Sequence, residues 1–173
     1  MKPSIFSLLC IIAIMACTNS PKVSENIGEA QVKEAQTVTQ NFLDALARND
    51  STAIFATFSS NPEGIYAMNG EFQKIVDMMP IAHQMTRSIS KQTFENITEH
   101  HLFLGPTVFI YDYKCLNKIY EKSGVVTTID PICGSYTFQK EEGGWKIVHA
   151  HETWMNVKVD SSMVKEQSNL LEK

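Results

Sequence analysis

Positive charge is not in surplus in this sequence: 15 Lys and Arg residues face 19 Asp and Glu residues, giving a formal net charge of −4. A chain with this balance has no basic face with which to neutralise phosphates, so nucleic-acid binding is disfavoured. The sequence also contains no internal repeat and no low-complexity segment. Its 173 residues and hydrophobic content of 43% fit one globular domain with a substantial core and short appendages.

The sequence also lacks an apolar run long enough to cross a bilayer. The run from Ile5 to Ala16 is short, follows one Lys, and is typical of the apolar part of a signal peptide. Its ending, Ile14-Met15-Ala16-Cys17, resembles a bacterial lipobox, in which the Cys is lipidated and becomes the first residue. We therefore expect a lipoprotein signal at 1–16, a polar tether at 17–28, and a location in the cell envelope. The alternative is a plain secretory signal cleaved near Ala16.

Cysteines are few. Of the four, Cys10 falls within the predicted signal and Cys17 is the lipidation candidate, which leaves Cys115 and Cys133 in the folded part. These two flank a predicted turn at residues 122–125, so a disulfide across a hairpin is one possibility. Because disulfide geometry is demanding, two free thiols are the other.

The first half of the chain shows helical spacing. Apolar residues recur at three- and four-residue steps over residues 29–48, and Asp50 can cap a second, short helix. Residues 65–68 form a short strand that stops at Asn69-Gly70. Helical spacing returns over residues 71–88, where Pro80 is expected to break or kink the helix.

The second half is strand-like, with segments at 92–104, 107–120, 125–140 and 143–154 joined by short turns. Pro131 is expected to interrupt the third of these, because proline cannot donate to a ladder. This order predicts an α+β fold over residues 29–158, followed by a polar tail at 159–173. We expect a cone, a cystatin-like α+β roll, with N-terminal helices packed on a strongly curved, mostly antiparallel sheet around a central pocket.

The last strand carries the two most noticeable histidines. Strict alternation places Trp145, Ile147, His149, His151 and Thr153 on one face, and both faces carry apolar groups. The alternation therefore predicts a strand in the interior of the sheet that forms a wall of the pocket.

Two phrases carry a family resemblance, one at residues 41–50 and one at residues 144–151. The second resembles the Gly-x-Trp-x-Ile-x-x-x-His strand of small SnoaL-like domains. The chain is thus similar, over about residues 29–157, to the nuclear transport factor 2-like superfamily, in its SnoaL-like and ketosteroid-isomerase-like branch. The resemblance implies a cone fold and a homodimer formed through the outer sheet face, but this fold hosts isomerases, cyclases, hydratases and binding modules alike.

The isomerase chemistry of that branch is not expected here. Its Tyr donor on the first helix corresponds to Phe42, which has no hydroxyl. Its catalytic Asp corresponds to residues 67–69, where there is no carboxylate. Two of the three parts needed for proton transfer and oxyanion binding are therefore missing.

The remaining candidates are polar side chains on the predicted strands. Our candidates for ligand contacts are His149, His151, Tyr66, Tyr111, Tyr113 and Trp154. His151, assisted by Asp112 or a tyrosine, is the candidate for a general base. A zinc site on the two histidines would need a third ligand from His100, His101, Asp112 or Cys115, and local spacing supplies none.

The sequence therefore favours binding over catalysis, without a cofactor or metal. The predicted function is a lipid-anchored, extracytoplasmic domain that binds a small, largely apolar molecule in its cone. The alternatives are a SnoaL-like isomerase or cyclase using His151, and a dimeric accessory module without a ligand.

Overall fold

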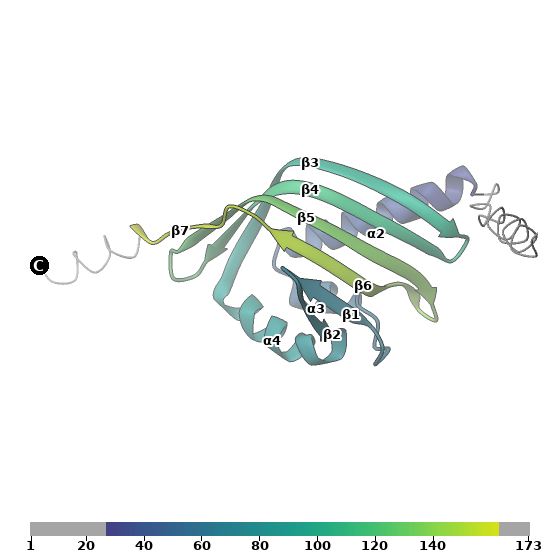
Figure 1. Ribbon diagram of the computed structural model, residues 1–173, viewed down its shortest axis with the longest axis horizontal. Helices are drawn as coiled ribbons and strands as arrows, with labels where there is room; N and C mark the ends of the chain where they lie inside the picture. Colours follow the sequence, from purple (N-terminus) through teal and green to yellow (C-terminus); the bar gives the residue numbers. More distant parts are fainter. Residues whose placement is uncertain (1–26, 163–173) are drawn as a thin grey trace, which may run out of the picture.

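The computed structural model describes residues 27–162, in which three helices cover one face of a curled sheet (Figure 1). The helices are α2 (Glu29–Ala47), α3 (Ser51–Ala56) and α4 (Ile75–Ser88). The strands are β1 (Ile65–Met68), β2 (Glu71–Lys74), β3 (Ile89–Gly105), β4 (Val108–Glu121), β5 (Val126–Glu141), β6 (Gly144–Trp154) and β7 (Lys158–Asp160). The predicted α+β cone, with helices on a curved and mostly antiparallel sheet, is confirmed.

The sheet has the order β2-β1-β6-β5-β4-β3, and β7 pairs with the first residues of β5. All pairings are antiparallel except β1 with β6, which is parallel. The prediction that the last long strand lies inside the sheet is confirmed, since β6 has neighbours on both sides. Strand pairing continues to Asp160, just beyond the predicted end of the domain at residue 158.

The N-terminal helices form as the sequence predicts. The backbone N–H of Gly28 donates to Gln31 at the start of α2, and Asp50 accepts from the backbone of Ala53 to cap α3. Between them Asn49 adopts a left-handed φ of 53°, and its side-chain amide donates to the carbonyls of Thr86 and Ile89. This one residue therefore joins the end of α2 to the α4–β3 junction.

The predicted helix over residues 71–88 is wrong at its start. Asn69 and Gly70 both have positive φ, 51° and 91°, which closes a two-residue hairpin and makes Glu71–Lys74 a strand. Helix α4 continues past Pro80, so of the two predicted outcomes, a break or a kink, the break is wrong.

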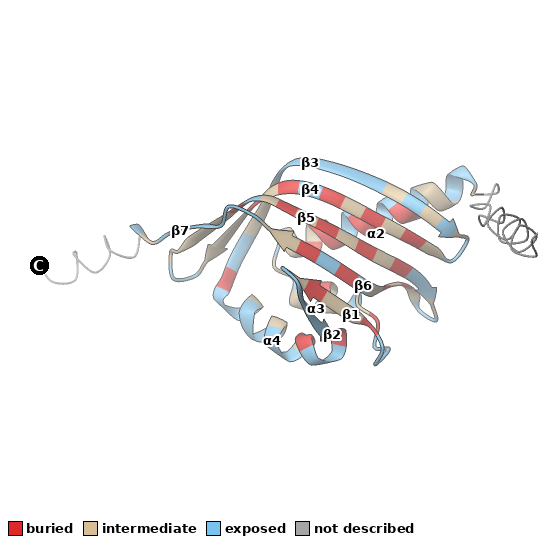
Figure 2. Cartoon of the chain, in the orientation of Figure 1, coloured by how far each residue is buried: buried red, intermediate tan, exposed pale blue. Residues whose placement is uncertain are grey.

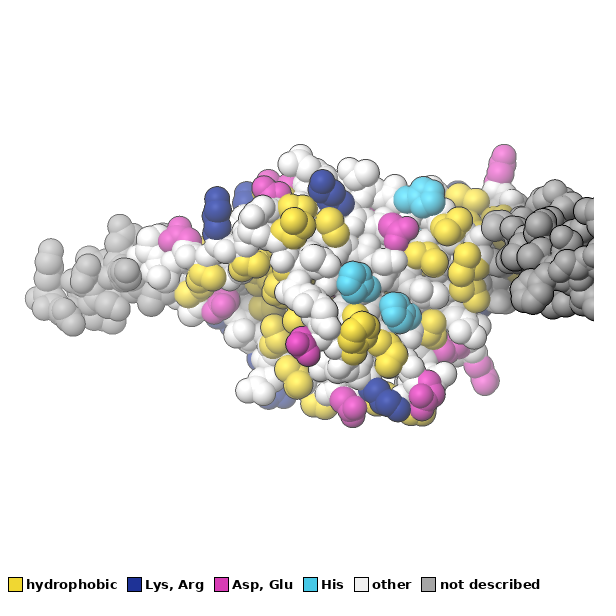
Figure 3. All heavy atoms as spheres, in the orientation of Figure 1, with side chains coloured by type: hydrophobic (Ala, Val, Ile, Leu, Met, Phe, Trp, Pro, Cys, Tyr) yellow, Lys and Arg dark blue, Asp and Glu magenta, His cyan; other side chains and the backbone are white. Residues whose placement is uncertain are grey.

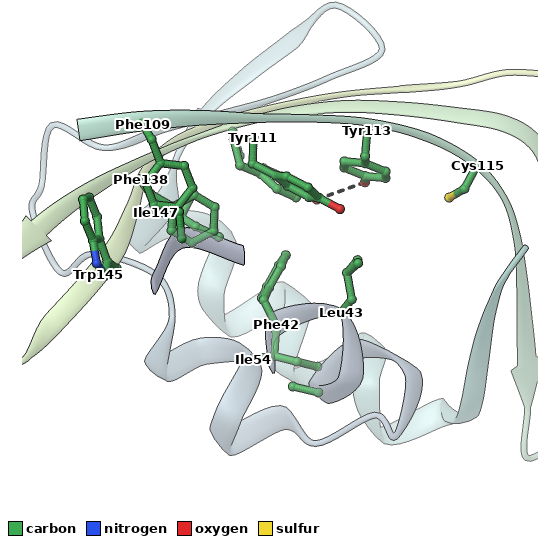
Figure 4. Packing of buried hydrophobic residues seen from close by; sticks show 14 of the residues in the cluster. Phe42, Leu43, Ile54, Phe109, Tyr111, Tyr113, Cys115, Phe138, Trp145 and Ile147 are labelled. Atoms are coloured by element: carbon green, nitrogen blue, oxygen red, sulfur yellow. Dashed lines mark hydrogen bonds between the residues drawn. The ribbon is translucent and has the colours of Figure 1, made fainter. Parts of the chain in front are cut away.

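The core lies between α2 and the concave face of the sheet, and buried positions alternate along β4, β5 and β6 (Figure 2). Phe109 and Phe138 stack with ring centroids 4.8 Å apart, and Trp145 meets Phe109 edge-on. Nearer the middle of the sheet, Tyr111, Tyr113 and Cys115 of β4 point towards α2, as Figure 4 shows.

Cys115 and Cys133 are both free thiols, so the possible disulfide is not formed. The residues lie on neighbouring strands, where Cys115 pairs with Ile132 and Cys133 pairs with Lys114. Cys115 is buried on the inner face, whereas Cys133 points to the outer face like its exposed partner Lys114. Two side chains on opposite faces of a sheet cannot be bridged without moving the backbone.

The predicted signal, Cys17 and the greater part of the predicted tether lie outside the described residues, as does residue 163 onward of the predicted tail. Among residues 27–162, no helix combines the length and the apolar character needed to cross a membrane.

Candidate functional site

The cavity lies between α3, α4 and the concave face of the sheet and has a volume of about 250 Å³. Phe42 and Leu46 of α2 form part of its wall, and α4 contributes Met78, Ile81, Ala82 and Met85. The strands supply most of the other lining side chains, which are Tyr66, Met68, Gln73, Ile89, Gln92, Phe94, Tyr113, Asn117, Ile119, Ile132, Tyr136, Glu152 and Trp154. The cavity is thus mainly apolar, with its polar groups gathered on a few strand residues.

A buried carboxylate, Glu152 of β6, is the centre of the polar end. It is only 7% exposed, and four side-chain donors bind its two oxygens. Its Oε1 accepts from the hydroxyls of Tyr113, at 2.9 Å, and Tyr136, while its Oε2 accepts from Tyr66 at 2.7 Å and from the indole N–H of Trp154 at 3.1 Å. We call these five residues the Glu152 cluster.

The cluster joins four strands of the sheet. Tyr66 comes from β1, Tyr113 from β4 and Tyr136 from β5, and the hydroxyls of Tyr113 and Tyr136 are 3.2 Å apart. Gly134 makes room for this arrangement, since a Cβ at this position would lie 2.2 Å from the Tyr113 ring. A side chain at residue 134 would therefore push Tyr113 away from the carboxylate.

A β-bulge explains why Glu152 faces the cavity. Opposite β5, Thr137 pairs with His149 and Phe138 with Ile147, so Val148 is an extra residue in β6. Trp145 and Ile147 are buried before the bulge, whereas Ala150 and Glu152 are buried after it. The strict alternation predicted for this strand is therefore wrong beyond Ile147.

The same bulge turns His149 and His151 outward. Both are exposed, and neither lines the cavity. The prediction that they face the pocket is wrong, because one extra residue reverses the face of every later side chain. Figure 3 shows histidine side chains at the surface on this outer side of the sheet.

Three of the six predicted ligand-contact residues do come together, namely Tyr66, Tyr113 and Trp154. Tyr111 points inward as well, but it is fully buried in the core beside the cavity and donates to Glu99 at 3.0 Å. Asp112 lies on the outer face, where it pairs with Ser135, whose other partner is His151. The proposed catalytic pair of His151 and Asp112 is therefore outside the cavity.

The metal candidates are likewise dispersed. His101 is turned inward, where its Nε2 lies 3.0 Å from the hydroxyl of Thr39 and burial lowers its pKa, while His100 is exposed. In the part of the chain that the structure describes, no three His, Cys, Asp or Glu side chains come together in a way that could hold a metal ion.

Glu152 was missed by the sequence analysis, although its position relates to the isomerase comparison. Phe42 and Met68 line the cavity without a hydroxyl or carboxylate, and Glu152 is the direct strand partner of Met68. An acid therefore lies one strand away from the residues at which the sequence resemblance placed the Asp of the isomerase branch. The usable signal was the apolar pattern of β6, which changes phase between Ile147 and Ala150.

The cluster keeps its tyrosines neutral. Burial and the nearby Glu152 charge raise the pKa of Tyr66 well above its usual value, and the same causes act on Tyr113 and Tyr136. Burial, with Glu99 beside it, also raises the pKa of Tyr111. These hydroxyls consequently serve as donors to carboxylates and not as anions.

Comparisons with known proteins identify the fold. No family model matches the chain, and no curated protein sequence matches it. A solved structure of a nuclear transport factor 2-like superfamily protein from Salmonella enterica serovar Typhimurium is similar, with 16% identity, 72% of this chain and 91% of that chain covered, and a TM-score of 0.61. A ketosteroid isomerase-like protein from Erwinia carotovora atroseptica gives 14% identity, coverages of 75% and 99%, and a TM-score of 0.60.

A type 2 hexachlorocyclohexane dehydrochlorinase is also similar, with 7% identity, coverages of 78% and 95%, and a TM-score of 0.58. At these identities the likeness is one of fold. The chain has the nuclear transport factor 2-like cone fold, which the sequence resemblance predicted, and proteins of this fold include both isomerase-like proteins and a dehydrochlorinase.

The raised tyrosine pKa values predict a loss of stability in base. Unfolded tyrosines ionise near pH ~10, whereas Tyr66, Tyr111, Tyr113 and Tyr136 stay protonated in the folded chain. The folded state then binds more protons than the unfolded state, so the free energy of unfolding falls as the pH rises above about 10. Urea unfolding from pH 9 to about pH 11 measures it, and Tyr66→Phe should make the decline shallower. A free energy of unfolding that stays constant over this pH range would contradict the raised pKa values of these tyrosines.

Proposed function

We propose that this chain is a lipid-anchored, extracytoplasmic domain that binds a small, mainly apolar molecule in its cavity without changing it chemically. The observation that carries the proposal is the cavity of about 250 Å³ with one polar end. Apolar walls and a few grouped polar side chains are typical of sites that hold a small organic molecule in one orientation.

The bonding of Glu152 favours binding over catalysis. A general base must offer a free lone pair to the proton that it removes. Both oxygens of Glu152 already accept two hydrogen bonds each, from Tyr113 and Tyr136 and from Tyr66 and Trp154. A carboxylate held in this way orients its neighbours and is poorly placed to accept a proton.

Catalysis is the second candidate function. One observation favours it: Glu152 is a carboxylate inside an apolar cavity, which is a typical setting for a catalytic acid or base. The catalytic version that relies on His151 has no support from its position, because this side chain is exposed on the outer face. A catalytic proposal would therefore have to use Glu152 with Tyr66 or Tyr113.

Filling the cavity tests the binding function. Ala82 of α4 lines the cavity, whereas Gln84 of the same helix is exposed and does not. We expect Ala82→Trp to weaken binding of the neutral apolar dye N-phenyl-1-naphthylamine by about tenfold or more, since the indole occupies the space of the dye. Gln84→Trp should bind as the parent does. Fluorescence titration measures both, and equal binding by all three proteins would place the dye elsewhere.

The anchor depends on Cys17. In full-length chain expressed in a bacterial host that is fed labelled palmitate, Cys17→Ser should lose the label that the parent incorporates, because the thiol that carries the lipid is gone. Cys10→Ser, within the predicted signal, is the matched control and should keep the label. Equal labelling of Cys17→Ser and the parent would exclude lipidation at this residue.

We further propose a homodimer through the outer face of the sheet. This face carries Leu102, exposed on β3, and its strand partner Ile110 on β4. Leu102→Glu should shift the domain towards monomer in sedimentation equilibrium, because a charge would be buried between the two copies. Val76→Glu, at an exposed apolar side chain of α4 that lies on the helix side of the sheet and does not line the cavity, serves as the control. If the parent protein is itself a monomer, the proposed homodimer is wrong.

A further inference from the structure

The lining of the cavity carries an acidic side chain but no basic one among the described residues. Among the described residues that line it, Glu152 is the only Asp, Glu, Lys, Arg or His. The ion pairs of the described chain join Lys74 with Glu63, Lys118 with Glu95 and Lys140 with Glu34, all at the surface. Within residues 27–162, the buried carboxylate therefore has donors around it but no cation.

The surrounding donors indicate that Glu152 is ionised. An indole N–H can only donate, so Trp154 requires an accepting oxygen, and two donors on each oxygen match the capacity of a carboxylate. Protonation would occupy one of the lone pairs that these four donors use. The polar end of the cavity consequently carries a negative charge in surroundings of low polarity, where charge acts strongly.

The tyrosine side chains of the cluster also favour a positively charged group in the cavity. The hydroxyl of Tyr66 donates to Glu152 and has no second hydrogen-bond partner among the described residues, unlike those of Tyr113 and Tyr136, which lie 3.2 Å apart, so the Tyr66 oxygen can accept a further hydrogen bond. The rings of these residues and of Trp154 line the same end. Hydroxyl lone pairs and aromatic faces both attract a cation, and neither favours an anion.

The rest of the cavity lining offers no competing charge. Beyond the cluster, the polar lining consists of the neutral side chains of Gln73, Gln92, Asn117 and Thr86. The amide of Asn117 already donates to Gln92 and to the carbonyl of Thr93. The rest of the cavity is apolar, so it suits the hydrocarbon part of a ligand.

We propose that the ligand is an organic amine in its ammonium form, carried on an apolar body, with the ammonium group at the Glu152 cluster. This inference rests on the proposed binding function and narrows it to one chemical class. The cation completes the charge balance of the buried carboxylate without displacing its four donors. Anionic amphiphiles such as fatty acids are excluded, because their carboxylate would meet Glu152.

Three ligands that share one apolar body test the charge preference. They are 1-naphthylmethylamine, which is a cation at neutral pH, the neutral 1-naphthalenemethanol, and the anion 1-naphthoate. Calorimetric titration of the folded domain should give about tenfold tighter binding for the amine than for the alcohol, and weaker binding still for the anion. The alcohol or the anion binding as tightly as the amine would overturn the inference.

Two variants test whether the preference for the amine over the alcohol arises at the Glu152 cluster. Glu152→Gln keeps the shape of the side chain and removes its charge, so the amine should lose its advantage over the alcohol. If this variant does not fold, Tyr66→Phe retains the carboxylate and removes one hydroxyl of the cluster, and it should reduce the advantage several-fold. Tyr120→Phe is the control, because Tyr120 does not line the cavity. An unchanged amine advantage in Tyr66→Phe would place the cation elsewhere and overturn the assignment.

The outcome also separates the two proposals. If the neutral dye binds and Ala82→Trp blocks it, but charge has no effect within the naphthyl series, the binding function stands and the amine inference fails. If neither the dye nor any naphthyl compound binds, both fail together.

Discussion

One buried carboxylate with four hydrogen-bond donors holds the functional end of this cone together. Glu152 accepts from residues of β1, β4, β5 and β6, which include both neighbours of its own strand. A buried charge is costly unless its hydrogen bonds are satisfied, and here each oxygen has two partners. The cluster therefore fixes the relative position of these strands and forms the polar end of the cavity.

The fold could be predicted from the sequence because its signals are local and repeated. Apolar spacing marks α2, alternation marks β4 and β5, and Asp50 caps α3 as expected. The misplaced start of α4 has a local cause as well. Asn69-Gly70 closes a hairpin, and a turn signal of this kind outweighs the helical spacing that follows it.

The site could be predicted only in part, and a single extra residue in β6 explains why the two predicted histidines do not reach the cavity. The sequence predicts ligand contacts by Tyr66, Tyr113 and Trp154, and these three residues converge at the cavity. Val148 adds one residue to β6, so Glu152 points inward and His151 outward, the reverse of what alternation implies. A bulge depends on pairing with the neighbouring strand, which periodicity within one strand does not report.

The bulge also changes how the last strand relates to function. Two histidines at alternate positions invite a catalytic or metal-binding interpretation, yet they lie on the outer face, where the proposed dimer would form. The chemistry of the cavity depends instead on a glutamate whose lone pairs are already occupied. This bonding favours recognition of a ligand over transfer of a proton.

The measurement that tests the central claim most directly is the free energy of unfolding of Glu152→Gln, compared with the parent domain and with Glu142→Gln. Both changes replace a carboxylate by an amide of the same shape, but Glu142 is exposed in the β5–β6 turn and Glu152 is buried. The account predicts a loss of about 2 kcal/mol or more for Glu152→Gln, because the amide nitrogen cannot accept from the hydroxyl and indole donors that face it, and no significant loss for Glu142→Gln. Equal stability of the two variants would show that the carboxylate does not hold the cavity together.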